Sequence, residues 1–564
     1  MTDLQENGPQ LDDEEDVFVV PTSFAQQSMW LENELDPGQA TYHVVAAVRL
    51  VGDLDRAALE RGLNTVVARH EALHTVFELE DEGPVQVIGA PPRLVVGVTD
   101  VDPADAEAAV AAEVRVPFDL ERGPLVRLRL LRTEPDRHIA VLTMHHIVTD
   151  GLSSAIFVAE LAACYVAYRE GREPELPPLA IQYADFAVWQ RENLTGVRLD
   201  ALAEYWAGTL EGAPALALAS DRPHPAVPSA DGATHVFEVP AALVREVEAL
   251  ARAERVTAFM VFLAAFDVLL ARYSGLRDIT VVSPMAGRTR PEVENLIGFF
   301  VNPLLLRVDL GGTPSARDLI ARARATCAGA YEHQEYPFEL ALEILRAERG
   351  AAPGTPQAQA MLVLQNQPPV DLRAAGLAFE QMRADTRTAG YELALDLEPD
   401  GTGAYRAFLE YARDLFDDTT AAEMAEVFVD VLADMAADPA APVDLAVLRE
   451  HPEPLPVEPE PERQAEVAHR APETPIEIEL QEVFHELLGV GNAGLDDDFF
   501  VLGGDSLSLI QLRNRIRQRF GVEFRVRDLS TRVDIGSLAP EVLRRMLDQD
   551  PGAPDAAAPV KENP

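Results

Sequence analysis

The sequence predicts a large unit of mixed α/β (α+β) architecture, joined by an extended linker to a small unit made only of helices. Helical and strand patterns alternate throughout residues 17–448, as in a mixed fold. From residue 474 to residue 548, apolar side chains recur only at helical spacing. Residues 449–473 are rich in proline and glutamate, which disfavours a packed core. A chain of 564 residues also exceeds what one hydrophobic core usually supports.

Three segments of the large unit justify its mixed class. Residues 138–144, HIAVLTM, are predicted to form a buried strand. Residues 244–275 are predicted to be helical, with an amphipathic start, a buried continuation and an end at Gly275. DITVVSPMAGR, residues 278–288, reads as a strand that runs into a loop.

The small unit is predicted to be a helical bundle. Its helices are expected at IEIELQEVFHELLGV, ending near Gly491, at SLSLIQLRNRIRQRFG and at SLAPEVLRRMLD. The acidic residues 1–16 and the tail 549–564 have no apolar period and are predicted to be disordered.

Charge and cysteine content exclude several classes of protein. The chain has 47 Lys and Arg against 94 Asp and Glu, a net charge of −47, which repels nucleic acids and anionic membranes. It has no run of about 18 apolar residues and no signal-peptide pattern. Cys164 and Cys327 lie far apart, so neither a disulfide framework nor a cysteine metal site is expected. We therefore expect a cytoplasmic protein with no metal and with neither nucleic acid nor membrane as a partner.

The strongest chemical pattern is HHIVTDG, residues 145–151, where the strand 138–144 runs into a loop. Neighbouring side chains on a strand point to opposite faces, so only one of His145 and His146 can face a given site. An imidazole there can act as a general base, because its pKa lies near the working pH. Asp150 is placed to hold the loop, and Gly151 allows close backbone approach or an amide donor. The alternative is a buried strand whose histidines only pack.

A second pattern surrounds Ser506, which follows Gly503, Gly504 and Asp505 at the start of a predicted helix. A phosphate attached to this serine would be stabilised by the helix dipole and by free amide groups. Asp505 or Ser506 could equally cap an ordinary helix, and these residues alone leave both interpretations open.

Four arginines on the same helix stand out in so acidic a chain. They form either a solvated helix face or a docking surface for a partner domain. The four are Arg513, Arg515, Arg517 and Arg519.

HHIVTDG resembles the signature of condensation domains of nonribosomal peptide synthetases, and further segments of the family recur in order over about residues 17–445. These are SFAQQSMWLENELDP (23–37), RHEALHTVF (69–77), YADFAVWQR (183–191), IGFFVNPLLLR (297–307) and HQEYPFELAL (333–342). His74 stands where arginine is usual and Pro303 where threonine is usual. The last family motif, within 354–367, keeps little beyond Gln365 and Asn366.

This resemblance implies two lobes similar to chloramphenicol acetyltransferase, at about residues 17–185 and 186–448, arranged as a V with a tunnel between them. His146 would face the tunnel and act as a base or position the attacking amine. His145 would be a structural support.

The resemblance also implies roles for the rest of the motif. Asp150 would support the loop, and Gly151 would lie near the thioester carbonyl. Arg288 is the expected partner of Asp150, with Arg69 as the alternative.

LGGDSL, residues 502–507, closely resembles the attachment site of peptidyl carrier proteins, and the likeness extends over about 474–547. It implies a four-helix carrier bundle in which Ser506, preceded by Asp505, carries 4′-phosphopantetheine. A phosphopantetheinyl transferase would attach this group.

Together the two resemblances imply amide formation between a donor acyl thioester on an upstream carrier protein and an acceptor amine. An adenylation domain normally separates the two units, and residues 449–473 are too short to hold one. We therefore expect a separate adenylation enzyme to load Ser506 in trans with an aminoacyl or peptidyl thioester. Loading by another acyltransferase, or use of the carrier to pass on the condensed chain, are the alternatives. About 25 extended residues reach up to roughly 80 Å, enough for the carrier to visit both partners.

Other functions share this pattern. The same fold also serves ester formation, transfer to a free acceptor and epimerisation, although epimerisation domains usually follow their carrier. Cyclisation is disfavoured because that branch replaces the histidines with aspartates. A non-catalytic recruitment platform with a tethered carrier is the remaining alternative, against which the intact His146 and Gly151 argue.

Overall fold

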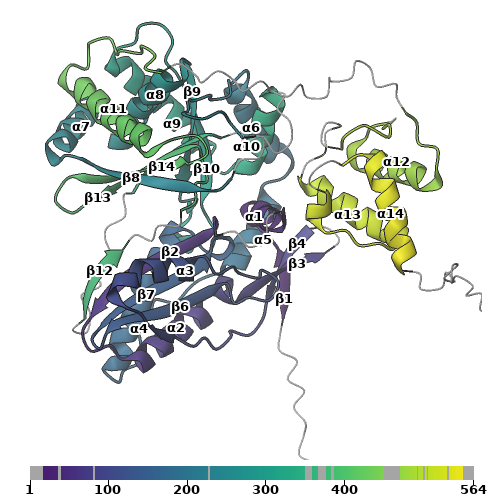
Figure 1. Ribbon diagram of the computed structural model, residues 1–564, viewed down its shortest axis with the longest axis horizontal. Coiled ribbons are helices and arrows are strands. Elements are labelled where there is room, and N and C mark those ends of the chain that lie inside the picture. Colours follow the sequence, from purple (N-terminus) through teal and green to yellow (C-terminus); the bar gives the residue numbers. More distant parts are fainter. Residues whose placement is uncertain are drawn as a thin grey trace, which may run out of the picture.

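The computed structural model describes residues 17–549 except 36–39, 81–82, 226–228, 350–357, 366–376, 383–386, 450–469, 492, 500–501, 503, 505 and 530–532. Two α/β lobes and a helical domain make up this part of the chain (Figure 1). The predicted disordered N-terminus, nearly all of the disordered tail and most of the predicted linker lie outside the described residues.

The first lobe is built on a five-stranded sheet of order β12-β2-β7-β6-β5. Its strands are β2 (His43–Val51), β5 (Gly97–Asp100), β6 (Val126–Glu134), β7 (Arg137–His145) and β12 (Ala378–Met382). β7 contains the predicted strand 138–144, and its second half is buried on both faces. Helices cover both faces of the sheet, which explains why β7 reads as a continuous apolar run.

Helices α2 (Arg56–Arg69) and α4 (Gly151–Arg169) pack on one face of this sheet and α3 (Ala106–Val114) packs on the other. By length and hydropathy α4 alone could cross a membrane, among the single helices of the described residues. Its buried Phe157 and Cys164 pack in the core of the lobe, so we interpret α4 as a core helix. Between the sheet and α2 and α4 lies a cavity of about 80 Å³ with a wholly apolar lining, which offers no polar group for chemistry.

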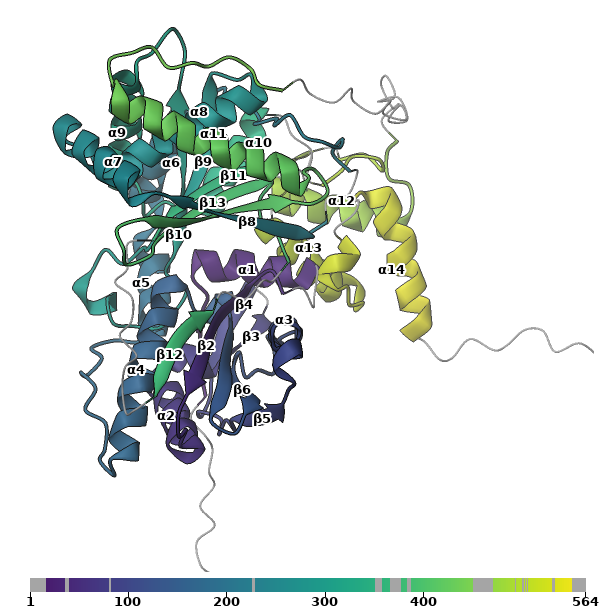
Figure 2. The ribbon, with the colours of Figure 1, turned by 60° about the vertical axis from the view of Figure 1, so that its left-hand side comes forward.

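A small antiparallel sheet, β1-β4-β3, lies beside the main sheet of the first lobe. Its strands are β1 (Phe18–Pro21), β3 (Thr75–Glu80) and β4 (Gly83–Ile88). Helix α1 (Phe24–Leu35) follows β1 and lies between the two lobes in both views (Figure 1; Figure 2). α5 (Tyr183–Asn193) also contacts β1.

The second lobe contains a six-stranded sheet of order β10-β9-β11-β13-β14-β8. The strands are β8 (Gly232–Val239), β9 (Asp278–Met285), β10 (Asn302–Asp309), β11 (Ala360–Leu364), β13 (Leu393–Pro399) and β14 (Tyr405–Ala412). Its helices are α6 (Gly196–Leu210), α7 (Ala241–Glu254), α8 (Ala258–Ser274), α9 (Ala316–Glu332), α10 (Phe338–Arg349) and α11 (Asp418–Ala437). α8 is buried along nearly its whole length and forms the centre of the core.

The helical stretch predicted at 244–275 is two helices, α7 and α8, rather than one. α7 ends at Arg255, whose φ of 58° is left-handed, and the two helix axes are bent by 107°. α8 ends at Gly275 as predicted, with a φ of 72° that glycine adopts without strain.

One strand departs from the predicted division into consecutive lobes. β12 belongs by sequence to the second lobe, yet it pairs antiparallel with β2 and extends the sheet of the first lobe. Leu377 and Phe379 pack there with the first lobe's core. The two lobes are therefore joined by an exchanged strand as well as by the chain between them.

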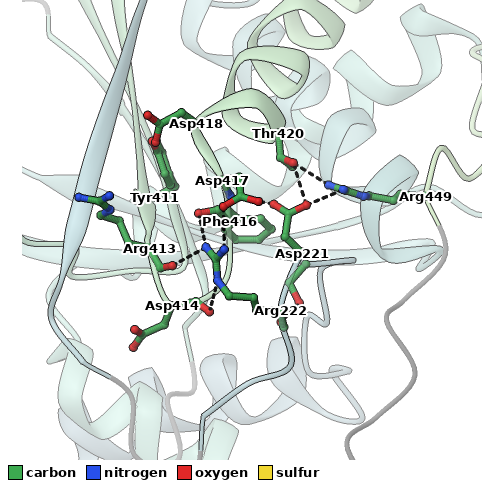
Figure 3. Close-up of polar contacts among 11 residues, drawn as sticks. Asp221, Arg222, Tyr411, Arg413, Asp414, Phe416, Asp417, Asp418, Thr420 and Arg449 are labelled. Atoms are coloured by element: carbon green, nitrogen blue, oxygen red, sulfur yellow. Dashed lines mark hydrogen bonds and ion pairs between the residues drawn. The ribbon is translucent and has the colours of Figure 1, made fainter.

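A polar network fixes the end of the second lobe where the chain leaves it (Figure 3). Arg449, the first residue of the predicted linker, bonds Thr420 Oγ1 at 2.8 Å and Asp221 Oδ1 at 2.5 Å. Arg222 bonds Asp417 Oδ1 at 2.7 Å and the carbonyl of Phe416 at 2.7 Å. These bonds fix the point from which the carrier is tethered.

The C-terminal helical domain, the expected carrier, contains α12 (Pro475–Leu488), α13 (Ser506–Phe520), α14 (Ile535–Gln549) and a short 3-10 helix, η5 (Val526–Leu529). The four-helix bundle is thus three α-helices and one turn of 3-10 helix among the described residues. α12 ends at Gly489, with a φ of 69°, two residues before the predicted end. Leu480, Phe484, Leu512 and Ile516 are fully buried between the helices.

Candidate active site and carrier site

The HHIVTDG segment joins the central strand of the first lobe to helix α4. β7 ends at His145, a 3-10 turn η3 (His146–Val148) follows, and α4 begins at Gly151. His145 Nδ1 accepts a hydrogen bond from the backbone N–H of Ile147 at 3.2 Å, which caps the turn. Asp150 Oδ1 accepts from the N–H of Ser153 at 2.7 Å, which caps α4. The motif therefore holds its own backbone in a rigid loop.

His146 lies at the interface between the lobes. Its backbone N–H donates to the carbonyl of Tyr42 at 2.8 Å, and its ring lies edge-on to Phe299 of the second lobe at 4.7 Å between centroids. Nδ1 is buried and has no hydrogen-bond partner among the described residues. Burial lowers the pKa of the imidazole, against the opposing effect of Asp150. His146 is therefore a neutral imidazole with an unused buried nitrogen.

His145 has a different environment. It is 2% exposed and lies opposite His43 in the β2–β7 register. Burial, with the neighbouring His43 and His146, lowers its pKa to about 3. Its Nδ1 is already occupied by Ile147, so its geometry is that of a support.

Asp150 and Arg288 form a buried ion pair between the lobes. Arg288 Nη2 lies 3.4 Å from Asp150 Oδ1, and both side chains are 3% exposed. Asp150 Oδ2 also accepts from the N–H of Phe300 at 3.0 Å. Arg69, the alternative partner, bonds Glu160 at 3.1 Å instead.

Arg288 has further bonds that hold it in place. Its guanidinium donates to Ser153 Oγ at 2.7 Å and to the carbonyl of Leu296 at 2.9 Å, and it lies over the ring of Phe300 at 4.1 Å. Gly287, just before it, has a φ of 64°, and a Cβ there would lie 1.9 Å from the carbonyl oxygen of Phe300. Only glycine fits at this position.

Gly151 is the first residue of α4, five residues after His146. It is exposed, and a Cβ built on it meets no atom within 4 Å. Packing within the protein therefore does not require glycine here, and the space beside it is open. The first amide groups of a helix have no intrahelical acceptor, so this end of α4 offers donors.

Three positioning residues were not identified from the sequence, although two lie in the family-like motifs. Gln26 of α1 donates to the carbonyl of Ile147 at 3.1 Å. Tyr183 donates to the carbonyl of Phe299 at 2.7 Å, and Gly298 packs so closely on its ring that a Cβ would lie 2.0 Å away. Ser153 donates to the carbonyl of Gly298 at 2.8 Å. The sequence did not reveal these contacts, two of which, those of Tyr183 and Ser153, cross between the lobes.

The carrier site lies at the start of α13. Ser506 is the first residue of this helix; Asp505 and Gly503 lie outside the described residues. A Cβ on Gly504 would lie 2.3 Å from the Cδ1 atom of the buried Phe499, and Gly504 N–H donates to the carbonyl of Phe499 at 2.9 Å. Gly504 therefore packs directly against Phe499, and a larger residue would not fit at this position. A helix start after such a turn fits a phosphate group linked to Ser506.

The carrier domain contacts the first lobe on the side of α1, as both views show (Figure 1; Figure 2). Asn514 Nδ2 donates to the carbonyl of Glu80 at 3.2 Å, and η5 lies against α1. Arg513 of the carrier attracts Glu34 and Glu121 of the first lobe. Of the four arginines, Arg513 thus faces the lobe, whereas Arg519 bonds Glu479 of α12 at 2.6 Å.

No group of three or more His, Cys, Asp and Glu is placed to hold a metal ion in the described part of the chain. Two α/β lobes that meet at a buried histidine loop, followed by a helical domain with a serine at a helix start, define an acyltransferase-type enzyme with an attached carrier. A family model for the condensation domain matches residues 18–451, and one for the phosphopantetheine attachment site matches residues 479–540. The chain belongs to the condensation-domain family of nonribosomal peptide synthetases and continues into a carrier domain. Condensation domains form peptide bonds by acyl transfer, and the carrier match implies covalently attached 4′-phosphopantetheine.

Known proteins agree with this assignment. The chain is 41% identical to a linear gramicidin synthase of Brevibacillus parabrevis over 467 residues, which are 79% of this chain and 6% of that protein. The X-domain from teicoplanin biosynthesis, also solved in complex with OxyB, is 29% identical with a TM-score of 0.68, covering 77% of this chain and 98% of that one. SgcC5 of Streptomyces globisporus, solved with a naphthyl ethanediol and sucrose, is 29% identical with a TM-score of 0.63, covering 75% and 100%. The lobes are thus of the condensation-domain fold, as predicted.

Proposed function

We propose that the chain forms an amide bond between a donor acyl thioester, carried by an upstream carrier protein, and an acceptor amine held on its own carrier domain. The observation that carries this proposal is the neutral, buried His146 at the lobe interface, in a chain whose own carrier docks on the adjacent face. The chain spans only 6% of the length of the gramicidin synthase, so peptide synthesis like that of this relative is assigned to the chain only as part of the proposal.

His146 is proposed to accept an N–H hydrogen bond from the neutral acceptor amine. As the nitrogen bonds to the thioester carbonyl carbon it becomes positively charged and its two protons become strongly acidic, so even an imidazole with a lowered pKa can take one of them. The carbon–sulfur bond breaks, and the proton passes on to the departing thiolate. Amide donors at the start of α4, near Gly151, are proposed to stabilise the carbonyl oxygen.

Asp150 and Arg288 are proposed to keep this loop in register with the second lobe. Their ion pair and the Ser153–Gly298 bond fix His146 against Phe299. His145 is proposed to stabilise the 3-10 turn through its hydrogen bond with the N–H of Ile147.

Ser506 is proposed to carry the 4′-phosphopantetheine, which supplies a thiol that holds the acceptor as a thioester. Asp505 is proposed to belong to the surface that the phosphopantetheinyl transferase recognises. No adenylation domain fits between residues 451 and 479, the bounds of the two family matches, so we propose loading in trans by a separate adenylation enzyme. The proposed location is the cytoplasm, where these partners meet.

Ser506→Ala is expected to abolish attachment of the phosphopantetheine, since the hydroxyl that bonds the phosphate is gone. Intact-protein mass after incubation with coenzyme A and a phosphopantetheinyl transferase measures this. Ser508→Ala, two residues along the same helix, is the matched control and should be modified like the native chain. A persistent mass increase in Ser506→Ala would refute the site. Loading of the modified chain by an amino acid and ATP alone, without a second enzyme, would refute loading in trans.

Arg513→Glu is expected to slow condensation from the chain's own carrier by about two- to tenfold, since it replaces attraction to Glu34 and Glu121 by repulsion. Condensation rate at fixed Ser506 loading measures the effect. Arg515→Glu is the control, because Arg515 is exposed and lies 4.0 Å from Glu486 of its own domain. Glu34→Arg should restore the rate of Arg513→Glu. An unchanged rate in Arg513→Glu, or no rescue, would contradict docking on this face.

Two other functions are favoured by specific observations. SgcC5 was solved with a diol, which favours a free, hydroxyl-bearing acceptor as the alternative substrate class. The X-domain forms a complex with OxyB, which favours a recruitment platform as the alternative role. A hydroxyl acceptor would give an ester, and a platform would give no product.

A further inference from the structure

A group of carboxylates and tyrosines lies on α1 and the elements around it, outside the histidine motif. Glu32 of α1 accepts a short hydrogen bond from the hydroxyl of Tyr42. Tyr391, which precedes β13, lies close enough to Glu32 for the carboxylate to raise the pKa of its phenol, although burial is the larger cause. Glu339 at the start of α10 repels Glu32 in turn. The group thus joins α1 of the first lobe to α10 and the β13 approach of the second.

Glu32 is exposed to solvent, yet the surrounding protein desolvates its carboxyl group enough to raise its pKa. A carboxyl group that solvent reaches and protein surrounds lies in a recessed space and not on a protruding face. The helix that carries it, α1, lies between the sheets of the two lobes (Figure 2).

This space lies next to His146. The carbonyl of Tyr42 accepts from the N–H of His146 at 2.8 Å, while the hydroxyl at the other end of Tyr42 bonds Glu32. Glu32 is therefore one tyrosine side chain away from the His146 backbone. It is placed to contact a part of the substrate other than the bond-forming nitrogen.

The space also lies on the carrier's side. The carrier helix η5 packs against α1, and Arg513 attracts Glu34, two residues after Glu32. The docked carrier thus lies against the helix that carries Glu32, so the acceptor, which this carrier is proposed to hold, is the substrate considered for Glu32.

Charge in the group is unbalanced. Glu339 Oε2 is buried and has no hydrogen-bond partner among the described residues. Repulsion from Glu32 and Glu343 adds to burial, and the pKa of Glu339 rises to about 7. The cation that attracts Glu339, Arg191, donates to the carbonyls of Thr22 and Ser23 at 2.8 and 3.2 Å. Two neighbouring carboxylates without a matching cation, one of them buried, favour a positively charged ligand.

We propose that Glu32, oriented by Tyr42 and assisted by Glu339, is a specificity-determining residue that binds a cationic side chain of the acceptor. An ammonium or guanidinium group on the acceptor occupies the space between these carboxylates, while its separate reacting amine meets His146. This inference rests on the proposed function and names the substrate class at the acceptor position.

The test compares two acceptors of similar size on the native chain's carrier. Ornithyl- and norvalyl-phosphopantetheine are attached to Ser506, and condensation with one acyl donor is followed by mass. The native chain should prefer ornithine by about tenfold or more, since a charge-assisted hydrogen bond is formed and no charge is left unpaired. Glu32→Gln should lower the rate with ornithine to that with norvaline and leave the norvaline rate unchanged.

Two variants separate recognition from structure. Glu32→Asp keeps the charge and should keep a preference for ornithine. Glu335→Gln removes a charge from the ion pair with Arg198, outside the group, and should change neither rate. Equal rates for the two acceptors in the native chain, or an equal loss with both in Glu32→Gln, would overturn the assignment while leaving condensation intact. No product from either acceptor would instead overturn the proposed function, and this assignment with it.

Discussion

Replacing His146 by alanine is expected to lower the condensation rate by about 10²–10⁴-fold, the usual range for a lost general base. The ring is the one buried imidazole at the lobe interface with an unused nitrogen, among the described residues. Phosphopantetheine attachment should be unchanged, because Ser506 lies in a separate domain. Product formation and carrier mass, measured in the same reaction, separate the two effects.

The pH dependence of the same reaction adds a second measurement. Burial lowers the pKa of His146, so the neutral, proton-accepting form persists below the ordinary histidine pKa of 6.5. The acceptor amine must also be neutral, so its protonation lowers the rates of both chains as the pH falls. The ratio of the native rate to the His146→Ala rate should therefore stay level down to pH 6.5 and decline only further down.

His138→Ala is the matched control for His146→Ala. His138 lies on the same strand, β7, but seven residues before the motif's first histidine, away from the lobe interface. Its replacement should leave the rate within about twofold, as for a surface-side substitution. Full product from His146→Ala would refute its role as base and leave a recruitment platform as the better function. Absence of product from the native chain would also favour a recruitment platform over catalysis.

Asp150→Ala is expected to cost about 3–5 kcal/mol of unfolding free energy in the large unit, the range for breaking a buried ion pair. The substitution leaves Arg288 buried and unpaired, frees the N–H of Phe300 and removes the cap of α4. These losses overlap, since they share one side chain, so they do not add. The two lobes would lose one of the contacts that hold them together beside His146.

Urea unfolding followed by tryptophan fluorescence measures this cost selectively. All three tryptophans, Trp30, Trp189 and Trp206, lie in the large unit. Asp150→Asn should cost less, because its amide oxygen can still accept from the N–H of Ser153 and cap α4.

A double-mutant cycle tests the ion pair itself. Asp150→Ala combined with Arg288→Met should be less destabilised than the sum of the single variants, because no buried charge remains unpaired. As a control, Arg69→Met should combine additively with Asp150→Ala, since Arg69 pairs with Glu160. A cost below about 1 kcal/mol for Asp150→Ala, or additivity with Arg288→Met, would contradict a stabilising pair.

The two predictions address different levels of the same site. His146→Ala removes a group that is proposed to contact the substrate, so its effect is on rate and not on stability. Asp150→Ala acts through position, so it should lower stability, and a conservative asparagine should recover part of it. A loss of stability in His146→Ala, together with a loss of rate but not of stability in Asp150→Ala, would contradict both assigned roles.

The amino-acid sequence by itself determined the local elements and the chemistry they present. The strand before His145, the end of α8 at Gly275 and the helix that begins at Ser506 were all predicted from local patterns. This succeeds because apolar periodicity and helix-ending residues record burial and backbone geometry within a few residues. The ordered motifs also identified the family, since they preserve residue types at fixed spacing.

Only the tertiary structure decided which distant residues meet. Arg288 lies 138 residues from Asp150, and nothing local distinguished it from Arg69 as the partner. The pairing of β12 with β2 and the docking of the carrier beside Glu32 likewise depend on how separate elements pack. A local pattern shows that a side chain is buried or charged, but its partner depends on where the chain returns after long connections. The residue types of the site can therefore be predicted from the sequence, whereas the residues that pair with them are known only from the folded chain.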